Sequence, residues 1–340
     1  MDAATITLIL KIIIGVVGIF GNTVVCVVIA KVPAMRTLTN AFIFNQAVID
    51  FLGSLFMILQ NNLQIPPAVS SNSAVAFLQC FVWRSAIILW IFFVASTLNL
   101  VVLTTERYVA IVYPFKYLTY FDRKRATAML VTVWVLAFVY KSNNVFLYEI
   151  QDRTCIFANL SRAASVAIGT ITFLIEYLIP LIYMTFCYVH IILQLKSASS
   201  TVHPEPSTSQ QGQNSMSGSL LRARRNTLKT LFIVFVTYTI CWTPNQIAFF
   251  MFNFGLPLNF QGAFYYISVI LVQLNTCVNP IIYALKYKQF QNGLRVLLKP
   301  CFPNLARRHD QESVPTISPR VQPTASHAQP NVEQEPEESP

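Results

Sequence analysis

The chain has 340 residues, of which 54% are hydrophobic and only 11% are charged, and its formal net charge is +10. Soluble domains carry about 25% charged residues, so this composition excludes an ordinary soluble protein and indicates a membrane protein. The positive clusters flank apolar segments and are not interleaved with aromatic residues, which favours contact with membrane lipid over binding of nucleic acid.

Seven segments are apolar over the roughly 20 residues that a membrane-spanning helix requires. Their approximate limits are Ile6–Ala30, Ala41–Leu63, Phe77–Val112, Thr127–Leu147, Ala164–Leu195, Leu228–Phe252 and Ala263–Leu285. The first segment lacks a preceding basic region and a small-x-small cleavage site, so we expect it to be retained as a helix. The predicted fold class is an all-α membrane protein with a bundle of seven transmembrane helices.

Lysine and arginine concentrate in the segments that follow spans one, three and five and in the C-terminal region. In multi-pass membrane proteins the cytoplasmic loops carry this excess of positive residues. We therefore expect a plasma-membrane protein whose N-terminus is outside the cell and whose C-terminus is in the cytoplasm.

Two hydrophilic regions are predicted to be disordered because they lack the apolar residues of a packed core. Residues 197–219 form the loop between spans five and six, and residues 302–340 form a cytoplasmic tail rich in Pro, Gln and Glu. The remaining domain, residues 1–301, ends with the amphipathic stretch Tyr287–Leu298. Cys301 follows that stretch and is predicted to be palmitoylated.

Asp50 is an acidic residue in the middle of the second span, where an ionisable side chain indicates a functional site. Asn22, Ser96, Asn275 and Asn279 supply further oxygen-bearing side chains in other spans. A carboxylate with hydroxyl and amide oxygens suits a small hard cation. A hydrogen-bonded network around a protonated aspartate is an equal alternative, and the residues alone leave both open.

Three prolines lie inside predicted spans, namely Pro180, Pro244 and Pro280. Each removes one backbone hydrogen bond and bends its helix. Bent helices that meet around a polar centre can move as rigid bodies between two states.

Two cysteines fall on the extracellular side of the predicted topology. Cys80 is at the outer start of the third span and Cys155 is in the loop between spans four and five. Because that compartment is oxidising, we expect a disulfide between them. Asn159 begins the sequon Asn-Leu-Ser in the same loop and is a predicted glycosylation site.

Taken together, these residues resemble the motifs of the rhodopsin-like (class A) G-protein-coupled receptors, from about Ile6 to Cys301. The matches in chain order are Gly21-Asn22, Asp50, Glu106-Arg107-Tyr108, Trp134, Pro180 with Tyr188, Cys241-Trp242-Thr243-Pro244 and Asn279-Pro280-Ile281-Ile282-Tyr283. Phe290, seven residues past Tyr283, fits the short amphipathic eighth helix of that family on the cytoplasmic side.

The resemblance implies an activation switch made of Glu106, Arg107, Tyr108, Tyr188, Trp242, Pro244, Asn279, Pro280 and Tyr283. Glu106 would hold Arg107 in the resting state, and Arg107 would turn toward Tyr188 and Tyr283 when helix six swings outward. Asp50, Ser96, Asn275 and Asn279 would form an allosteric sodium site, with no other cofactor implied. Arg107, Phe115 and Arg224 would contact a heterotrimeric G protein, while arrestin and receptor kinases are further implied partners.

Several positions depart from the family pattern. Arg224 occupies the place where many members carry a glutamate that pairs with the arginine of helix three, so we expect ligand-independent signalling. The residues packed below the pocket near Pro180 are Thr97 and Tyr238 rather than isoleucine and phenylalanine. Helix three is two residues longer than usual between Cys80 and Arg107, which leaves the register of its outer half open.

The predicted ligand pocket contains Leu89, Phe93, Lys141, Glu176, Asn245, Gln246, Phe249 and Gln273. No acidic residue lies between Cys80 and Thr105, which disfavours an amine ligand, and the absence of a lysine in the seventh span excludes a retinal Schiff base. Glu176 could pair with Lys141, bind a cationic group of the ligand, or stay protonated.

The whole pattern is similar to peptide-binding members such as the galanin, allatostatin and somatostatin group, and to invertebrate orphan receptors. It predicts a receptor for an extracellular ligand, most simply a neuropeptide, that activates a G protein. A receptor for a lipid or another small molecule is the alternative within the family. A transporter or an enzyme is disfavoured, because neither a polar relay across the membrane nor a catalytic pair is visible.

Overall fold

The computed structural model describes residues 3–63, 65–66, 68–200, 211–260 and 262–300, without the side chains of 3–4, 197–200 and 211–225. The chain divides into two units, Met1–Leu298 and Lys299–Pro340, and every helix and strand below belongs to the first. Cys301 and the predicted tail, residues 302–340, lie outside the described residues.

Seven helical segments of the described chain are long and apolar enough to cross a membrane, which confirms the predicted number. Six of them are α1 (Ala3–Lys31), α2 (Leu38–Asn62), α4 (Ile87–Val112), α6 (Arg123–Lys141), α9 (Gln211–Asn253) and α10 (Ala263–Lys286). The fifth in chain order is continuous but has three parts: α7 (Arg162–Phe173), the π-helix Leu174–Leu178 and α8 (Ile179–Ser200).

Side-chain caps fix where several of these helices begin, because the first backbone N–H groups of a helix have no partner within it. Thr37 accepts a hydrogen bond from the backbone N–H of Asn40 at the start of α2, at 3.2 Å. Asp122 does the same for Arg125 at the start of α6, at 2.7 Å, and Ser161 caps α7. A short 3₁₀ turn, Pro33–Met35, joins α1 to α2.

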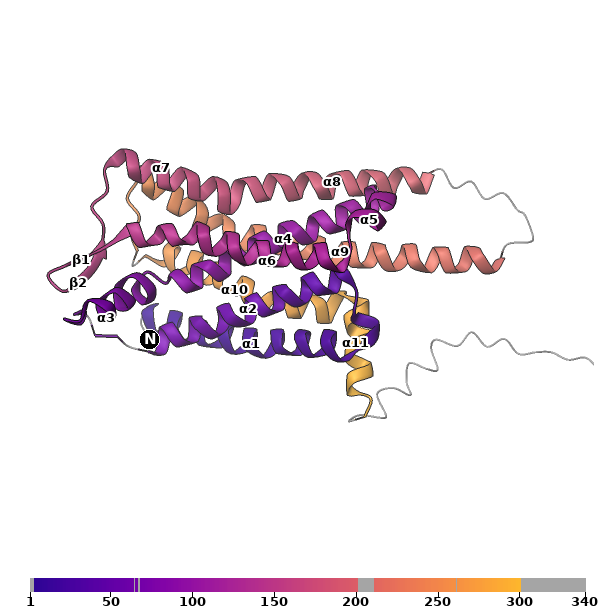
Figure 1. The fold of residues 1–340 in the computed structure, drawn as a ribbon, viewed down its shortest axis with the longest axis horizontal. Helices are drawn as coiled ribbons and strands as arrows, with labels where there is room; N and C mark the ends of the chain where they lie inside the picture. Colours follow the sequence, from indigo (N-terminus) through magenta and orange to yellow (C-terminus); the bar gives the residue numbers. More distant parts are fainter. Residues whose placement is uncertain (1–2, 64, 67, 201–210, 261, 301–340) are drawn as a thin grey trace, which may run out of the picture. The chain divides into compact units, whose positions relative to one another are not determined.

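The helices pack as a bundle in which α1 contacts α2 and α10, α2 contacts α4, and α4 contacts α6 and α8, while α9 contacts α7 and α10 (Figure 1). Small residues allow the closest approaches. A Cβ atom on Gly21 of α1 would lie 2.9 Å from the Cβ of Pro280 in α10, and one on Gly18 would lie 2.1 Å from the Oγ of Ser54 in α2. These glycines therefore set how near α1 comes to its neighbours.

The third span is interrupted, so the prediction of one continuous helix from Phe77 to Val112 is wrong. A short helix α3 (Ser73–Phe77) leads into the π-helix Leu78–Arg84, and Ala86 then adopts a left-handed conformation with φ of 53° before α4 begins. A π-helix uses more residues per turn than an α-helix. The wide turn and the break take up the extra length between Cys80 and Arg107, and an unbroken helix runs from Ile87 to Arg107.

The fourth span also differs from its prediction, because α6 ends at Lys141 and residues Ser142–Leu147 form a 3₁₀ helix rather than more α-helix. A two-stranded antiparallel hairpin follows, formed by β1 (Tyr148–Gln151) and β2 (Thr154–Phe157), with Ile150 opposite Cys155. Asn159 is exposed just after β2.

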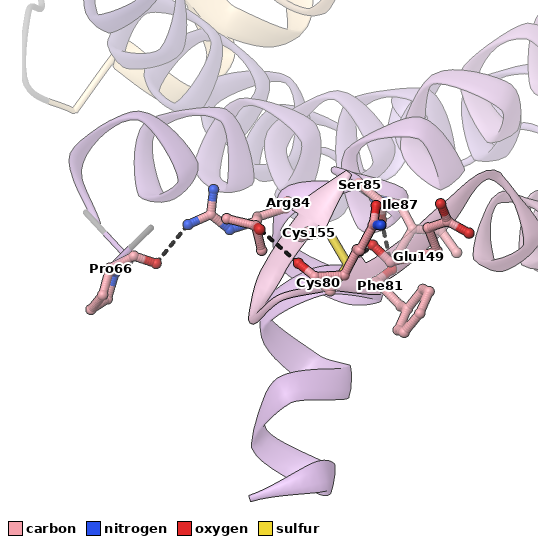
Figure 2. The surroundings of a disulfide bond; sticks show 10 residues. Pro66, Cys80, Phe81, Arg84, Ser85, Ile87, Glu149 and Cys155 are labelled. Carbon is pink, nitrogen blue, oxygen red and sulfur yellow. Dashed lines mark hydrogen bonds between the residues drawn. A yellow bond between two sulfur atoms is a disulfide. The ribbon is translucent and has the colours of Figure 1, made fainter. Parts of the chain in front are cut away.

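A disulfide joins Cys80 to Cys155 with a Cα–Cα distance of 5.4 Å, which confirms the predicted pair (Figure 2). It ties the hairpin to the π-helix above α4. Beside it, Arg84 donates from Nη2 to the carbonyl of Pro66 at 2.6 Å, and the Ser85 hydroxyl donates to the carbonyl of Phe81 at 2.6 Å. The disulfide thus cross-links the short elements at this end of the bundle.

The other end of the bundle carries two short helices, α5 (Pro114–Tyr120) and α11 (Lys288–Leu298) (Figure 1). In α11, Phe290 and Gly293 are buried while the charged and amide side chains lie on other faces, so the predicted short amphipathic helix is confirmed. Of the predicted loop, residues 197–200 and 211–219 are helical ends of α8 and α9, and residues 201–210 lie outside the described residues.

Candidate functional site

Glu106 and Arg107 form an ion pair near the end of α4 that leads into α5, with Glu106 fully buried and Arg107 partly buried. The guanidinium Nε donates to Glu106 Oε2 at 2.5 Å and Nη2 donates to Oε1, while the Glu106 side chain is 0% exposed. Two more donors reach the same carboxylate: the Thr39 hydroxyl of α2 at 3.1 Å and the Tyr117 hydroxyl of α5 at 2.7 Å. A buried charge needs such a set of partners to offset its lost hydration.

Tyr117 was not singled out from the sequence. It lies in the short helix α5, outside the spans, and its hydroxyl is directed at Glu106. Burial raises the pKa of Tyr117 above its usual value of 10.0, and the negative charge of Glu106 raises that pKa further. The hydroxyl therefore stays protonated at neutral pH and remains a hydrogen-bond donor.

Among the described residues, the remaining switch residues make no hydrogen bond to this pair. Tyr108 points toward α8, where its hydroxyl lies 2.9 Å from Nδ1 of His190. Tyr188 and Tyr283 are both buried, and the Tyr283 hydroxyl has no hydrogen-bond partner among the described residues. Arg224 is in α9, but its side chain lies outside the described residues.

Tyr287, also missed in the sequence, joins several elements at the same end. It follows α10, and its hydroxyl lies 2.7 Å from both Asn40 Oδ1 of α2 and Gln289 Oε1 of α11. One residue earlier, the carbonyl of Lys286 accepts a 3.1 Å hydrogen bond from the Thr230 hydroxyl of α9. The inner end of α9 is therefore bonded to α10.

Asp50 is the centre of a second buried cluster, halfway along α2. It accepts hydrogen bonds from Asn279 at 2.8 Å, from the Ser96 hydroxyl at 3.3 Å and from Gln46 Nε2 at 3.1 and 3.2 Å. Gln46 was not predicted, although it lies one helical turn before Asp50 on the same face. The four side chains come from α2, α4 and α10, so the cluster connects three helices.

Two other residues expected near Asp50, Asn22 and Asn275, make no hydrogen bond to it among the described residues. Asn22 donates to the carbonyls of Gly18 and Thr276 at 2.9 and 2.8 Å and so joins α1 to α10 rather than binding Asp50. Asn275 lies one turn before Asn279 in α10, and the side-chain oxygens of both are buried without a hydrogen-bond partner among the described residues. The side-chain oxygen of Asn22 is likewise buried, so three amide oxygens of these residues have no hydrogen-bond partner among the described residues.

Trp242 is the floor of the predicted pocket. It is 1% exposed, and its ring meets Phe93 of α4 edge-on with centroids 5.9 Å apart and Tyr238 at 5.8 Å. Pro244 lies inside α9 two residues later, where a helix bends. A movement of Phe93 would therefore be transmitted to α9 by direct contact.

The other pocket residues lie on α4, α9 and α10. Leu89, Asn245, Gln246 and Gln273 are buried, and Phe249 is half-buried. Asn245 donates to the Ser268 hydroxyl of α10 at 3.3 Å. The side-chain oxygens of Gln246 and Gln273 have no hydrogen-bond partner among the described residues, so the amide groups of these two residues have bonding capacity left over.

Glu176 and Lys141 form a second ion pair, between the π-helix Leu174–Leu178 and the last residue of α6. Lys141 Nζ lies 2.5 Å from Glu176 Oε1, and the two side chains are 7% and 1% exposed. Tyr140 donates to the same oxygen at 3.1 Å, and the ammonium group lies 5.2 Å from the centre of the Trp90 ring. The structure thus contains the first of the three arrangements of Glu176 that the sequence left open.

A comparison with known protein families identifies the family of this chain. Residues 21–283 match the model of the family described as 7 transmembrane receptor (rhodopsin family). This chain belongs to the rhodopsin family of receptors. It is therefore a G-protein-coupled receptor and not an enzyme, and the receptor is a multi-pass membrane protein.

Several individual receptors are similar to this chain over most of their length. The chain is 28% identical to a QRFP-like peptide receptor of Branchiostoma floridae, covering 87% of the chain and 78% of that receptor. It is 28% identical to neuromedin-U receptor 2 of Mus musculus, covering 84% and 73%. It is also 24% identical to an allatostatin-A receptor of Bombyx mori, covering 84% and 77%, and this is one of the groups expected from the sequence.

Proposed function

We propose that this receptor binds a peptide at its extracellular face and in response activates a heterotrimeric G protein. The printed names of its similar relatives, a QRFP-like peptide receptor, neuromedin-U receptor 2 and an allatostatin-A receptor, support a peptide ligand. The buried Glu106–Arg107 pair is the observation that carries the switching mechanism. A ligand-binding event at the outer end has to release this pair at the inner end.

The proposed orientation places the N-terminus and the hairpin outside the cell and the tail in the cytoplasm. The start of α1 and the hairpin lie at one end of the helices, and α5 and α11 lie at the other (Figure 1). The Cys80–Cys155 disulfide favours an oxidising compartment for the hairpin end. The basic residues Lys116, Arg123, Lys124 and Arg125 favour the cytoplasm for the α5 end.

In the resting state, Glu106 fixes Arg107 against α4. Activation would free the guanidinium to approach Tyr188 and Tyr283, both of which are buried nearby on α8 and α10. The vacated inner surface would then admit the G protein. Phe115 of α5 supports this, because it is 86% exposed, lies two residues before Tyr117, which bonds to Glu106, and offers an apolar contact to a partner.

The surroundings of Asp50 fit a sodium ion, because a carboxylate, the Ser96 hydroxyl and the unbonded oxygens of Asn275 and Asn279 are hard ligands. Sodium bound here would supply a positive charge that stabilises the ionised carboxylate in the resting state. We expect NaCl to raise the unfolding temperature of the receptor above that in KCl, and Asp50→Asn to remove the difference. An equal temperature in both salts for the unmodified receptor would contradict a sodium site.

The ligand would reach Leu89, Phe93, Phe249 and the amides of Asn245, Gln246 and Gln273. These amides favour a peptide, because they can both donate to and accept from peptide groups. Glu176 and Lys141 would act as an edge of this pocket. We further propose glycosylation at Asn159 on the extracellular side and palmitoylation at Cys301 on the cytoplasmic side. Arrestin, receptor kinases and anionic lipid are the other proposed partners.

The test is a screen of a neuropeptide library on cells that express the receptor, read through several second messengers. Active peptides are then added to purified receptor in lipid nanodiscs, and guanine-nucleotide exchange on purified G proteins is measured. We expect at least one peptide to accelerate exchange. Activation by lipids or small metabolites, with no response to any peptide, would favour the alternative ligand class.

A further inference from the structure

Glu176, in the outer half of the bundle, is bonded to residues of two neighbouring helices. Its carboxylate is bonded to Lys141 and Tyr140 of α6, as described above. Its backbone carbonyl accepts a 3.0 Å hydrogen bond from the Tyr238 hydroxyl of α9. We call these four residues the Glu176 junction, and they connect α6, the π-helix Leu174–Leu178 and α9.

The Glu176 carbonyl is available to Tyr238 because of Pro180. In an α-helix the carbonyl of residue 176 would accept from the backbone N–H of residue 180, but proline has no N–H. The backbone around Glu176 widens into a π-helix before Pro180, and its carbonyl, which cannot accept from residue 180, accepts from the Tyr238 hydroxyl of α9. A phenylalanine at position 238, usual in the family, could not make this bond.

Stability alone is a poor explanation for the ion pair. Burying two charges costs several kcal/mol each, and well-packed apolar residues in their place are often as stable or more stable. The second carboxylate oxygen, Oε2, is buried with no hydrogen-bond partner among the described residues. The pair lies within the spans, where ionisable residues are costly and indicate a functional site.

The junction is in physical contact with Trp242 by two routes. Through α9, Tyr238 bonds to Glu176 and its ring contacts Trp242 with centroids 5.8 Å apart. Through α4, the Lys141 ammonium lies against Trp90, which contacts Phe93 at 5.7 Å, and Phe93 contacts Trp242 at 5.9 Å. A change in the ion pair would therefore alter the packing of Trp242 from both sides.

We propose that the Glu176 junction holds Trp242 and α9 in the resting arrangement, so that opening the junction activates the receptor in the absence of ligand. This inference rests on the proposed receptor switch. Glu176 acts here as a positioning residue, because it is 2% exposed and its carboxylate is engaged by Lys141 rather than open to the extracellular side. An agonist would work by loosening the junction through Trp90 or Tyr238.

The first experiment removes the Tyr238 hydroxyl, which bonds α9 to Glu176 and also hydrogen-bonds with Thr97 of α4. Tyr238→Phe keeps the ring against Trp242 and introduces the residue usual in the family, so we expect it to fold. One hydrogen bond corresponds to roughly a two- to tenfold shift in a two-state equilibrium, so ligand-free nucleotide exchange on G protein, per mole of receptor in nanodiscs, should rise by about that factor. A rate of ligand-free nucleotide exchange in Tyr238→Phe equal to that of the unmodified receptor would overturn the proposal.

The matched control for this variant is Tyr183→Phe. Its hydroxyl lies 2.9 Å from the Thr105 hydroxyl, so it also joins α8 to a neighbouring helix, but it has no contact with the junction. We expect its ligand-free exchange to match that of the unmodified receptor. An equal rise in both variants would mean that loosening any inter-helix bond of the fifth span activates, which would overturn a specific role for Glu176.

The second experiment tests the ion pair by exchanging its charges. Glu176→Gln and Lys141→Met should each raise ligand-free exchange, and the double variant with Lys141→Glu and Glu176→Lys should return toward the unmodified rate. Lys11→Met is the matched lysine control, because Lys11 also lies in the outer half of a span but forms no ion pair with any described residue. A double variant as active as the single ones would overturn the role of the pair.

A measurement on the receptor alone separates this inference from the proposed function. Hydrogen–deuterium exchange of α9 should be faster in Tyr238→Phe than in the unmodified receptor or in Tyr183→Phe. If no peptide activates any G protein but Tyr238→Phe both speeds the hydrogen–deuterium exchange of α9 and raises ligand-free nucleotide exchange, then the proposed peptide function fails while the junction stands. If a peptide activates the receptor but the hydrogen–deuterium exchange of α9 is the same in the unmodified receptor and both variants, then the inference about the junction fails. The proposed function then stands.

Discussion

The two buried ion pairs of this receptor differ in what they hold together. Glu106 and Arg107 are neighbours on a single helix, whereas Lys141 and Glu176 are 35 residues apart and join two. The inner pair restrains other elements only because Thr39 and Tyr117 also bond to its carboxylate. It can therefore release Arg107 without separating helices, while the outer pair cannot open unless α6 and the π-helix move apart.

The largest expected difference between the pairs is in stability. Lys141→Met leaves Glu176 with one donor in a buried site, which should cost about 3–5 kcal/mol of unfolding free energy. Arg107→Met leaves Glu106 with both Thr39 and Tyr117, so its cost should be smaller, about 1–3 kcal/mol. Thermal unfolding of both variants in the same nanodiscs measures this. A greater loss for Arg107→Met would reverse the comparison.

The next effect concerns ligand-free activity through the inner pair. Glu106→Gln keeps the shape of the side chain but removes the charge that holds Arg107, so ligand-free nucleotide exchange should rise by about tenfold, the factor that corresponds to about 1.4 kcal/mol. Thr39→Val provides a milder version, because it removes one hydrogen bond and no charge. If Glu106→Gln were no more active than Thr39→Val, then the charge of the pair would not be its essential feature.

A substitution at position 224 also tests how Arg107 controls ligand-free activity. In the proposed arrangement Arg224 would repel Arg107, so Arg224→Glu should lower ligand-free exchange by up to about fivefold, because an exposed ion pair contributes up to about 1 kcal/mol. Arg224→Gln should give an intermediate rate. Unchanged ligand-free activity in the glutamate variant would show that α9 is held at this end by other bonds, such as that of Thr230 to Lys286.

The smallest effect is expected for Tyr117→Phe, which removes one hydrogen bond from Glu106 and should raise ligand-free exchange about two- to fivefold. Because the pKa of Tyr117 is raised above 10.0, the contribution of its hydroxyl is complete below pH 10 and is lost only as the pH rises through the higher value. The ratio of variant to unmodified activity should thus stay constant from pH 6 to pH 9. A ratio that changes in this range would contradict a protonated donor.

Much of this architecture could be predicted from the sequence, because each predicted feature has a short-range or topological cause. The spans follow from apolar length, and the Cys80–Cys155 disulfide follows from two cysteines that the topology places on the same side. Asp50 and Asn279 meet because each is a costly polar residue in mid-span that needs a partner.

Other features depend on how separate elements pack and have no clear signal in the sequence. Tyr117 reaches Glu106 only because α5 folds back onto the bundle, and Tyr287 reaches Asn40 only because of the bend between α10 and α11. The break at Ala86 was hidden for another reason, since a left-handed alanine is uncommon and no glycine or proline marks the position. Gln46 alone could have been found, from its spacing of four residues before Asp50.

The most direct test of the account is ligand-free nucleotide exchange by purified receptor, compared between the unmodified protein and Glu106→Gln in the same lipid and with the same G protein. The account predicts exchange above the receptor-free rate for the unmodified protein and about tenfold faster exchange for the variant. Two receptors with equal rates, or neither above the receptor-free rate across the G-protein classes, would contradict a switch held by the Glu106–Arg107 pair.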